Sequence, residues 1–136
     1  MTANAEGRVL VAGRAQGEAL VLSERLSFWG GLDPVSGRII DVHHPQLGAQ
    51  VTGRILVLPG TRGSVSGPGT LAEAIRLGSG PCGIILPAPD VAIVSAVTVT
   101  EALYGRAIPV LCLEPGAYRS IANAQTLTIG EAGLLR

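Results

Sequence analysis

Short apolar runs separated by glycine-containing turns make up the first half of the chain. Residues 8–12 and 18–22 are two such runs, and the five residues between them include two glycines, which is typical of a hairpin or meander. Another strand is expected at residues 38–42, directly after the turn-forming residues 33–37. The pattern therefore predicts a first half that is rich in antiparallel strands.

In the second half, apolar runs alternate with segments of helical composition. The segment 91–104 is rich in β-branched residues, but its length and the N-cap residue Asp90 favour a helix. Strands that alternate with helices pair in parallel through right-handed crossovers. Together the two halves predict one α/β domain over residues 1–136, with three β/β/α layers. The strands expected here are 55–58, 83–86, 109–113 and 127–129, and the helices are 70–77, 91–104 and 115–122.

The composition fits a single folded domain and removes several kinds of chemistry. Of the 136 residues, 47% are hydrophobic and the net charge is zero, so the chain is not expected to be disordered. All ten basic residues are arginines. Without a lysine there is no Schiff base and no Walker A phosphate site. The balanced charge also gives no basic surface for a nucleic acid or an anionic membrane.

The cysteines and the N-terminal residues predict a reduced compartment. Cys82 and Cys112 form no disulfide framework and no CxxC pair, and both adjoin apolar runs, where small core residues are expected. Residues 1–8 lack the apolar segment of a signal peptide. The apolar stretch 82–100 is interrupted by two prolines and an aspartate, so it is not expected to span a membrane. We therefore expect a cytoplasmic protein with no membrane partner.

The segment 58–70 carries the most informative candidate chemistry. It follows a buried strand and precedes a helix, which is where backbone N–H groups and the helix dipole bind an anion. Its glycines let the backbone approach a ligand closely. The residues expected to bind a substrate are Arg62, Gly63, Ser66 and Gly67, with a hydroxyl of the loop presented to it. The alternative is a surface loop whose serines only cap the helix.

Two other segments have both a structural and a functional interpretation. Phe28 and Trp29 adjoin paired glycines and are expected to be packing anchors, or else an apolar surface for a partner chain. His43 and His44 are adjacent, and neighbouring side chains on an extended chain point to opposite faces. One buried and one exposed histidine are therefore expected, and no metal site is predicted on this chain.

Several of these segments together resemble the small subunit of the aconitase X family. The resemblance extends from about residue 7 to the C-terminus. The phrase Phe-Trp-Gly-Gly-x-Asp followed later by Arg-Gly-Ser is its most specific part. The matching segments are residues 26–33 (LSFWGGLD), 37–41 (GRIID), His44-Pro45, Gly48, 58–64 (LPGTRGS), 71–75, Ala88-Pro89-Asp90 and Ile108-Pro109-Val110.

This resemblance implies a swivelling β/β/α domain of the aconitase type that docks on a large catalytic subunit. The large subunit would carry the metal-ligating cysteines, and hence an iron or iron–sulfur cluster, so no cofactor is expected on this chain alone. Family members are hydro-lyases that act on cis-3-hydroxy-L-proline or on phosphomevalonate. Ser64 matches the serine that accepts the substrate proton, and Arg62 would hold the substrate carboxylate with two hydrogen bonds.

Of the two substrates, the residues favour the small hydroxy acid cis-3-hydroxy-L-proline. The chain is neutral and the loop has one cation, Arg62, whereas a phosphorylated substrate favours additional basic side chains. The alternatives are the small subunit of a phosphomevalonate dehydratase and a non-catalytic module that binds a small anion. The loop also departs from the family pattern, since Val65 and Pro68-Gly69 interrupt a run that is usually richer in serine. The role of Ser66 is therefore left open.

Overall fold

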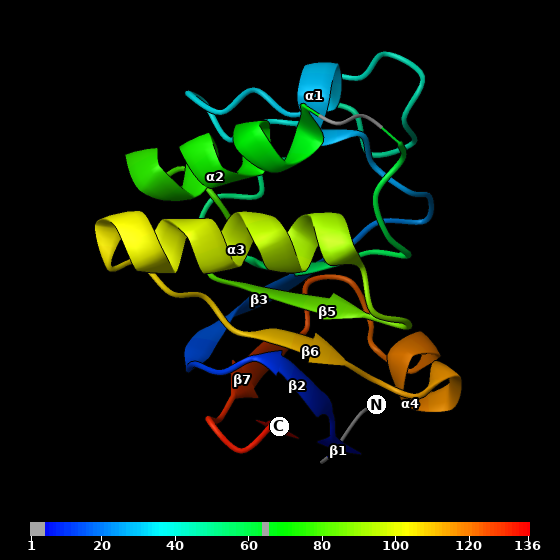
Figure 1. The fold of residues 1–136 in the computed structure, drawn as a ribbon. Helices are drawn as coiled ribbons and strands as arrows, with labels where there is room; N and C mark the ends of the chain where they lie inside the picture. Colours follow the sequence, from blue (N-terminus) through cyan, green and yellow to red (C-terminus); the bar gives the residue numbers. More distant parts are fainter. Residues whose placement is uncertain (1–4, 64–65) are drawn as a thin grey trace.

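A row of parallel strands forms the centre of the molecule (Figure 1). The computed structural model describes residues 5–63 and 66–136, and within them β3, β4, β5 and β6 pair in parallel in that order. β2 joins the outer edge of β6 in antiparallel orientation. The strands are β2 (Arg8–Val11), β3 (Ala15–Val21), β4 (Ile55–Val57), β5 (Gly83–Leu86) and β6 (Val110–Cys112).

Two helices cover one face of this sheet. α2 (Gly67–Leu77) connects β4 to β5, and α3 (Val91–Tyr104) connects β5 to β6, as expected for right-handed crossovers (Figure 1). The Asp90 side chain accepts a hydrogen bond from the Ile93 N–H, which confirms the predicted N-cap of α3. The short helices α1 (Phe28–Gly31) and α4 (Pro115–Arg119) follow β3 and β6. Among the described residues, no helix is long and apolar enough to cross a membrane.

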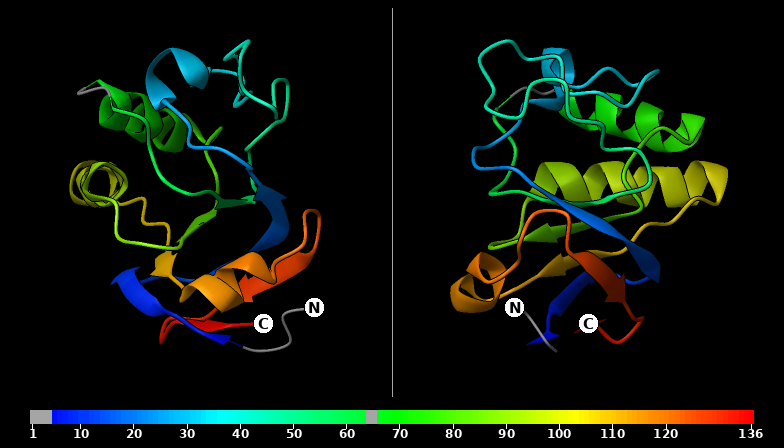
Figure 2. Two further views of the ribbon diagram at one scale, coloured as in Figure 1. Left: turned by 90° about the vertical axis from the view of Figure 1, so that its right-hand side faces the viewer. Right: turned by 180° about the vertical axis from the view of Figure 1, so that it is seen from behind.

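The opposite face of the sheet is covered by an antiparallel layer. β1 (Ala5–Glu6), β8 (Leu134–Leu135) and β7 (Thr126–Ile129) continue the strand order up to β3. β3 belongs to both layers, because its first half pairs with β7 and its second half, from Ala19 to Val21, pairs with β4. Figure 2 shows β7 on the side of the parallel strands that lies away from α2 and α3.

The parallel strands are buried on both faces, and this produces two apolar cores. In β4, Ile55 and Val57 face the antiparallel layer, whereas Leu56 faces the helices. β5 and β6 alternate in the same way. A strand covered on both faces is expected to be apolar throughout, which is how these runs read in the sequence. The predicted α/β fold with β/β/α layers is therefore confirmed.

Several local predictions need correction. β2 and β3 do not form a hairpin, because β2 pairs with β6 and β3 pairs with β4 and β7. Residues 38–42 are not a strand: within the described chain they make only isolated bridges, through Arg38 and Ile39. α2 begins at Gly67 instead of residue 70, because Pro68 is compatible with a first helical turn, where its missing N–H is not needed.

Candidate active site

Three loops meet at the carboxyl edge of the parallel strands, where α/β sheets usually bind ligands. Residues 22–27 follow β3, residues 58–63 follow β4, and residues 87–90 follow β5. A parallel bridge joins Leu26 to Thr61, and the Leu26 carbonyl accepts a hydrogen bond from the Arg62 N–H at 3.2 Å. The loop that contains the predicted site residues is therefore held by the loop that follows the neighbouring strand.

Thr61 is held by all three of its polar groups. Its backbone N–H donates to Oδ2 of Asp90 at 2.8 Å, and its hydroxyl donates to the same oxygen at 2.9 Å. Its carbonyl accepts a hydrogen bond from Nη1 of Arg25 at 3.2 Å. Burial raises the pKa of the Asp90 carboxyl, but hydrogen bonds from Thr61, Ile93 and Ala92 outweigh it and keep the pKa below its usual range. The Asp90 side chain is thus a carboxylate anion held in place by these hydrogen bonds.

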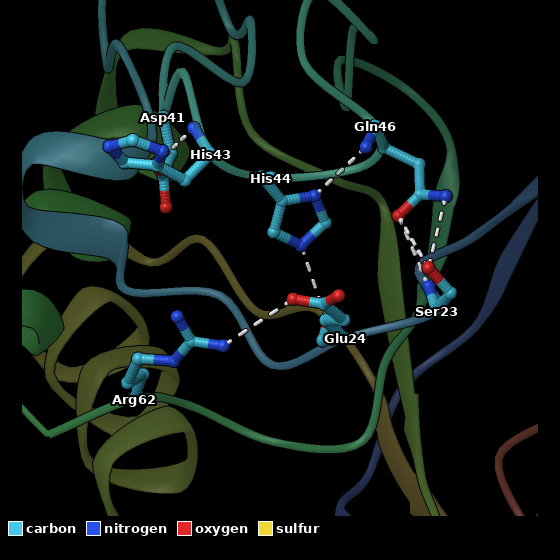
Figure 3. Close-up of polar contacts among 7 residues, drawn as sticks. All are labelled: Ser23, Glu24, Asp41, His43, His44, Gln46 and Arg62. Atoms are coloured by element: carbon cyan, nitrogen blue, oxygen red, sulfur yellow. Dashed lines mark hydrogen bonds and ion pairs between the residues drawn. The ribbon is translucent and has the colours of Figure 1, made fainter.

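Two arginines lie at this edge in different surroundings. Arg62 is exposed and forms an ion pair with Glu24, with Nη2 and Oε1 3.6 Å apart (Figure 3). Arg25 is also exposed, and no carboxylate of the described residues pairs with it within 4.0 Å. Its Nη1 lies over Gly60, where a Cβ atom would be only 2.6 Å away. Gly60 also has a φ of 149°, a backbone conformation that favours glycine, and a Cβ there would displace the end of the Arg25 side chain.

His44 supports the loop that carries Glu24 (Figure 3). The ring is 5% exposed, and its Nδ1 accepts a hydrogen bond from the Gln46 N–H at 3.0 Å. The proton therefore lies on Nε2, which is 3.3 Å from the Glu24 carbonyl oxygen and donates to it. His43 is exposed, so the prediction of one buried and one exposed histidine is confirmed.

The predicted site residues are only partly placed by the structure. Ser64, the predicted proton acceptor, lies outside the described residues. Arg62 and Gly63 are exposed at the carboxyl edge, Ser66 holds the N-cap position of α2, and Gly67 is buried beside Phe28. The α2 N-terminus therefore lies in the same loop region as Arg62, which suits an anionic ligand.

Glu24 and Arg25 were not predicted from the sequence as members of this edge, and Thr61 was predicted only as part of the segment 58–70, with no role of its own. The available signal was their position directly after apolar strands that pair in parallel. Phe28 is buried as predicted, but Trp29 is 61% exposed and is not a packing anchor in this chain. Cys82 and Cys112 are free and half-buried.

Asp90 and His44 are both held by hydrogen bonds within the protein. The Asp90 carboxylate is occupied by hydrogen-bond donors, and both nitrogens of His44 are engaged. Across residues 5–63 and 66–136, no three His, Cys, Asp or Glu side chains come together as a metal site. The described residues thus place basic side chains and a helix N-terminus at one edge of the sheet, an arrangement that can bind an anion.

Comparison with known proteins shows which family this chain resembles. The family model for the aconitase X swivel domain matches residues 4–135. Cis-3-hydroxy-L-proline dehydratase of Pseudomonas aeruginosa is 47% identical over 106 residues, which are 78% of this chain and 18% of that protein. The phosphomevalonate dehydratase small subunit of Methanocella arvoryzae is 31% identical over 132 residues, 96% of each chain. The chain therefore spans about a fifth of the first relative and nearly all of the second.

Solved structures agree on the fold. The crystal structure of Thermococcus kodakaraensis aconitase X in its holo form matches with a TM-score of 0.86 and 24% identity, covering 98% of this chain and 96% of the other. The solution NMR structure of a UPF0107 protein matches with a TM-score of 0.84 and 28% identity, covering 98% and 97%.

Proposed function

This chain belongs to the aconitase X swivel domain family, and from that membership we propose that it is the small subunit of a two-chain dehydratase acting on a hydroxy acid. The observation that carries the proposal is the family match over residues 4–135 together with the sequence Arg62-Gly63-Ser64, of which Arg62 and Gly63 lie at the carboxyl edge of the sheet. A site made of one loop and a helix N-terminus needs further groups from a partner.

A large subunit is the partner proposed. The P. aeruginosa relative is a much longer protein, of which the matched region is 18%. The M. arvoryzae relative is named a small subunit and has nearly the same length as this chain. The iron or iron–sulfur cluster implied by the family resemblance is proposed to lie in the large subunit, because the described residues here do not form a metal site. A cytoplasmic location is proposed for the complex.

In the proposed reaction, Ser64 accepts a proton from the substrate carbon that bears the carboxylate. The C–H electron pair forms the new carbon–carbon double bond. The hydroxyl on the neighbouring carbon takes up a proton and departs as water. A serine hydroxyl is a weak base unless nearby donors stabilise its alkoxide. The α2 N-terminus and Arg62 are the candidate donors on this chain. Arg62 would also bind the carboxylate and stabilise the charge that develops on it.

Cis-3-hydroxy-L-proline is the proposed substrate. The supporting observation is the 47% identity to the P. aeruginosa enzyme over 78% of this chain. Phosphomevalonate is the second candidate, because Arg25 and Arg62 lie at the same edge and two arginines suit a phosphate group. The phosphomevalonate dehydratase small subunit of Methanopyrus kandleri is 48% identical over 52% of this chain.

The test is anaerobic assay of this chain co-expressed with the matching large subunit. Both substrates are supplied in parallel, and loss of one water is followed by mass spectrometry. We expect turnover of cis-3-hydroxy-L-proline that disappears in Ser64→Ala and persists in Ser95→Ala, which removes an exposed hydroxyl of α3 outside the candidate site. Turnover of phosphomevalonate alone would identify the second candidate. A stable complex without turnover of either compound would contradict the dehydratase proposal and favour an anion-binding module.

A further inference from the structure

Asp90 connects two elements that the catalytic proposal does not otherwise link. One of its oxygens accepts the Ile93 N–H at 3.2 Å and so caps α3. The other accepts both the N–H and the hydroxyl of Thr61. α3 packs against α2 and the sheet, so Asp90 ties the start of the substrate-binding loop to a rigid element.

Thr61 is the residue directly before Arg62 and three positions before Ser64. Arg25 holds its carbonyl, while Asp90 holds its N–H and hydroxyl. With all three polar groups engaged, rotation of the Thr61 backbone would break at least one charge-assisted hydrogen bond. The direction in which the chain leaves Thr61 toward Arg62 is therefore fixed.

We propose that Asp90 is a positioning residue, which sets the location of Arg62 and of the loop behind it by holding Thr61. The expected effect of Asp90 on turnover rests on the proposed function, because it requires that Arg62 and Ser64 act on a substrate. Asp90 makes no contact with the substrate in this scheme, and its carboxylate transfers no proton. A misplacement of about 1 Å at a catalytic group can cost roughly a hundredfold in rate, so the anchor matters for turnover.

Variants of Asp90 and Thr61 test the hydrogen bonds between these two residues directly. In Asp90→Asn, the new amide nitrogen can donate but cannot accept, so one of the bonds from Thr61 or Ile93 loses its acceptor. Thr61→Ser keeps the hydroxyl and Thr61→Val removes it. The matched control is Asp33→Asn: Asp33 likewise accepts a backbone N–H, from Val35 at 3.0 Å, and a hydroxyl, from Ser36 at 2.8 Å.

The Asp33 turn lies at the other end of α2. The hydroxyl of Ser79, which follows the C-terminus of α2, donates to the carbonyl of Pro34. Loss of the Asp33 hydrogen bonds therefore tests general destabilisation without disturbing the loop at the α2 N-terminus.

The experiment measures kcat and KM of the co-expressed complex for these variants, alone and combined with Arg62→Ala. We expect kcat/KM to fall at least about tenfold in Asp90→Asn, to stay within about twofold in Thr61→Ser and Asp33→Asn, and to fall less in Thr61→Val. Arg62→Ala should cost much less in the Asp90→Asn background than in the wild type, since the two changes act on one unit. A purely structural role for Asp90 would leave the cost of Arg62→Ala unchanged and would overturn the proposal.

A second measurement does not depend on activity. Hydrogen exchange of the Thr61 amide in the full chain should accelerate in Asp90→Asn and not in Asp33→Asn. Unchanged Thr61 protection in Asp90→Asn would overturn the proposal. If the wild-type complex turns over neither substrate, the proposed function fails on its own, while amide exchange still decides whether Asp90 holds the loop.

Discussion

Arg62 and Glu24 face each other across two loops that follow neighbouring parallel strands, with Nη2 and Oε1 3.6 Å apart. Both side chains are more than half exposed, at 59% and 52%. Exposed ion pairs of this kind contribute little to stability. If Arg62 binds the substrate carboxylate as proposed, Glu24 competes with that carboxylate for the Arg62 guanidinium.

Glu24→Gln is expected to lower the KM of the complex for a carboxylate substrate, because Arg62 no longer has an acidic partner. Arg62→Ala should raise the KM by at least about tenfold, the effect of losing a charge-assisted contact of 1.4 kcal/mol or more. Steady-state kinetics of the two variants measure both effects. A higher KM in Glu24→Gln would show instead that Glu24 orients Arg62 productively.

Gly60→Ala is expected to destabilise the chain by about 1–3 kcal/mol, because the residue has a φ of 149°, which favours glycine, and the Arg25 guanidinium would have to move away from the new Cβ. Gly63→Ala is the control, since a Cβ there meets no described atom within 4 Å. Its change should stay within about 0.5 kcal/mol. Denaturant unfolding of both variants measures the difference, and equal losses would count against this account of Gly60.

His44→Ala should lower the free energy of unfolding by about 1–3 kcal/mol, because the partly buried carbonyl of Glu24 and N–H of Gln46 lose their shared partner. His43 is exposed, and the Asp41 carboxylate bonds to its backbone N–H, which alanine keeps. His43→Ala should therefore be nearly neutral. Thermal unfolding of the pair is the measurement, and a larger loss in His43→Ala would contradict the assignment.

Phe28 and Trp29 are adjacent but are expected to respond in opposite ways. Phe28 is 1% exposed, so Phe28→Ala should cost about 3–5 kcal/mol of stability. Trp29 is 61% exposed, and Trp29→Ala should leave the isolated chain stable but weaken its association with the large subunit. Trp29 is the one tryptophan of the chain, so its fluorescence reports directly on this surface. Unchanged emission on complex formation would place the interface elsewhere.

Acid stability should depend on Asp90. Because its pKa in the folded chain lies below the ordinary value of 3.8, its contribution to stability is present above that value and is lost as the pH falls through the folded pKa. Hydrogen bonds from Val35 and Ser36 lower the pKa of Asp33 in the same direction. Asp90→Asn and Asp33→Asn should each reduce the loss of unfolding free energy that occurs as the pH falls. The double variant should show the smallest loss. Chemical unfolding between pH 5 and 2 tests this, and an unchanged slope in Asp90→Asn would refute it.

The sequence by itself determined the elements whose cause is local. The apolar run of β4 indicated a buried strand and that of β5 a second strand, and α3 was predicted at its observed bounds from its length and the cap at Asp90. Periodicity, capping and turn residues act within a few positions, so they can be recognised without knowledge of the rest of the chain. The resemblance of the Arg62-Gly63-Ser64 loop to aconitase X was visible in the same way.

Only the tertiary structure decided which distant segments meet. The hairpin expected between β2 and β3 does not form, because β6 and β7 offer these strands partners from the far end of the chain. Glu24, Arg25, Thr61 and Asp90 become neighbours because three parallel strands end at one edge of the sheet. Strand pairing is set by long-range hydrogen bonding and by the burial of shared apolar faces, and neither can be inferred from the residues adjacent in sequence.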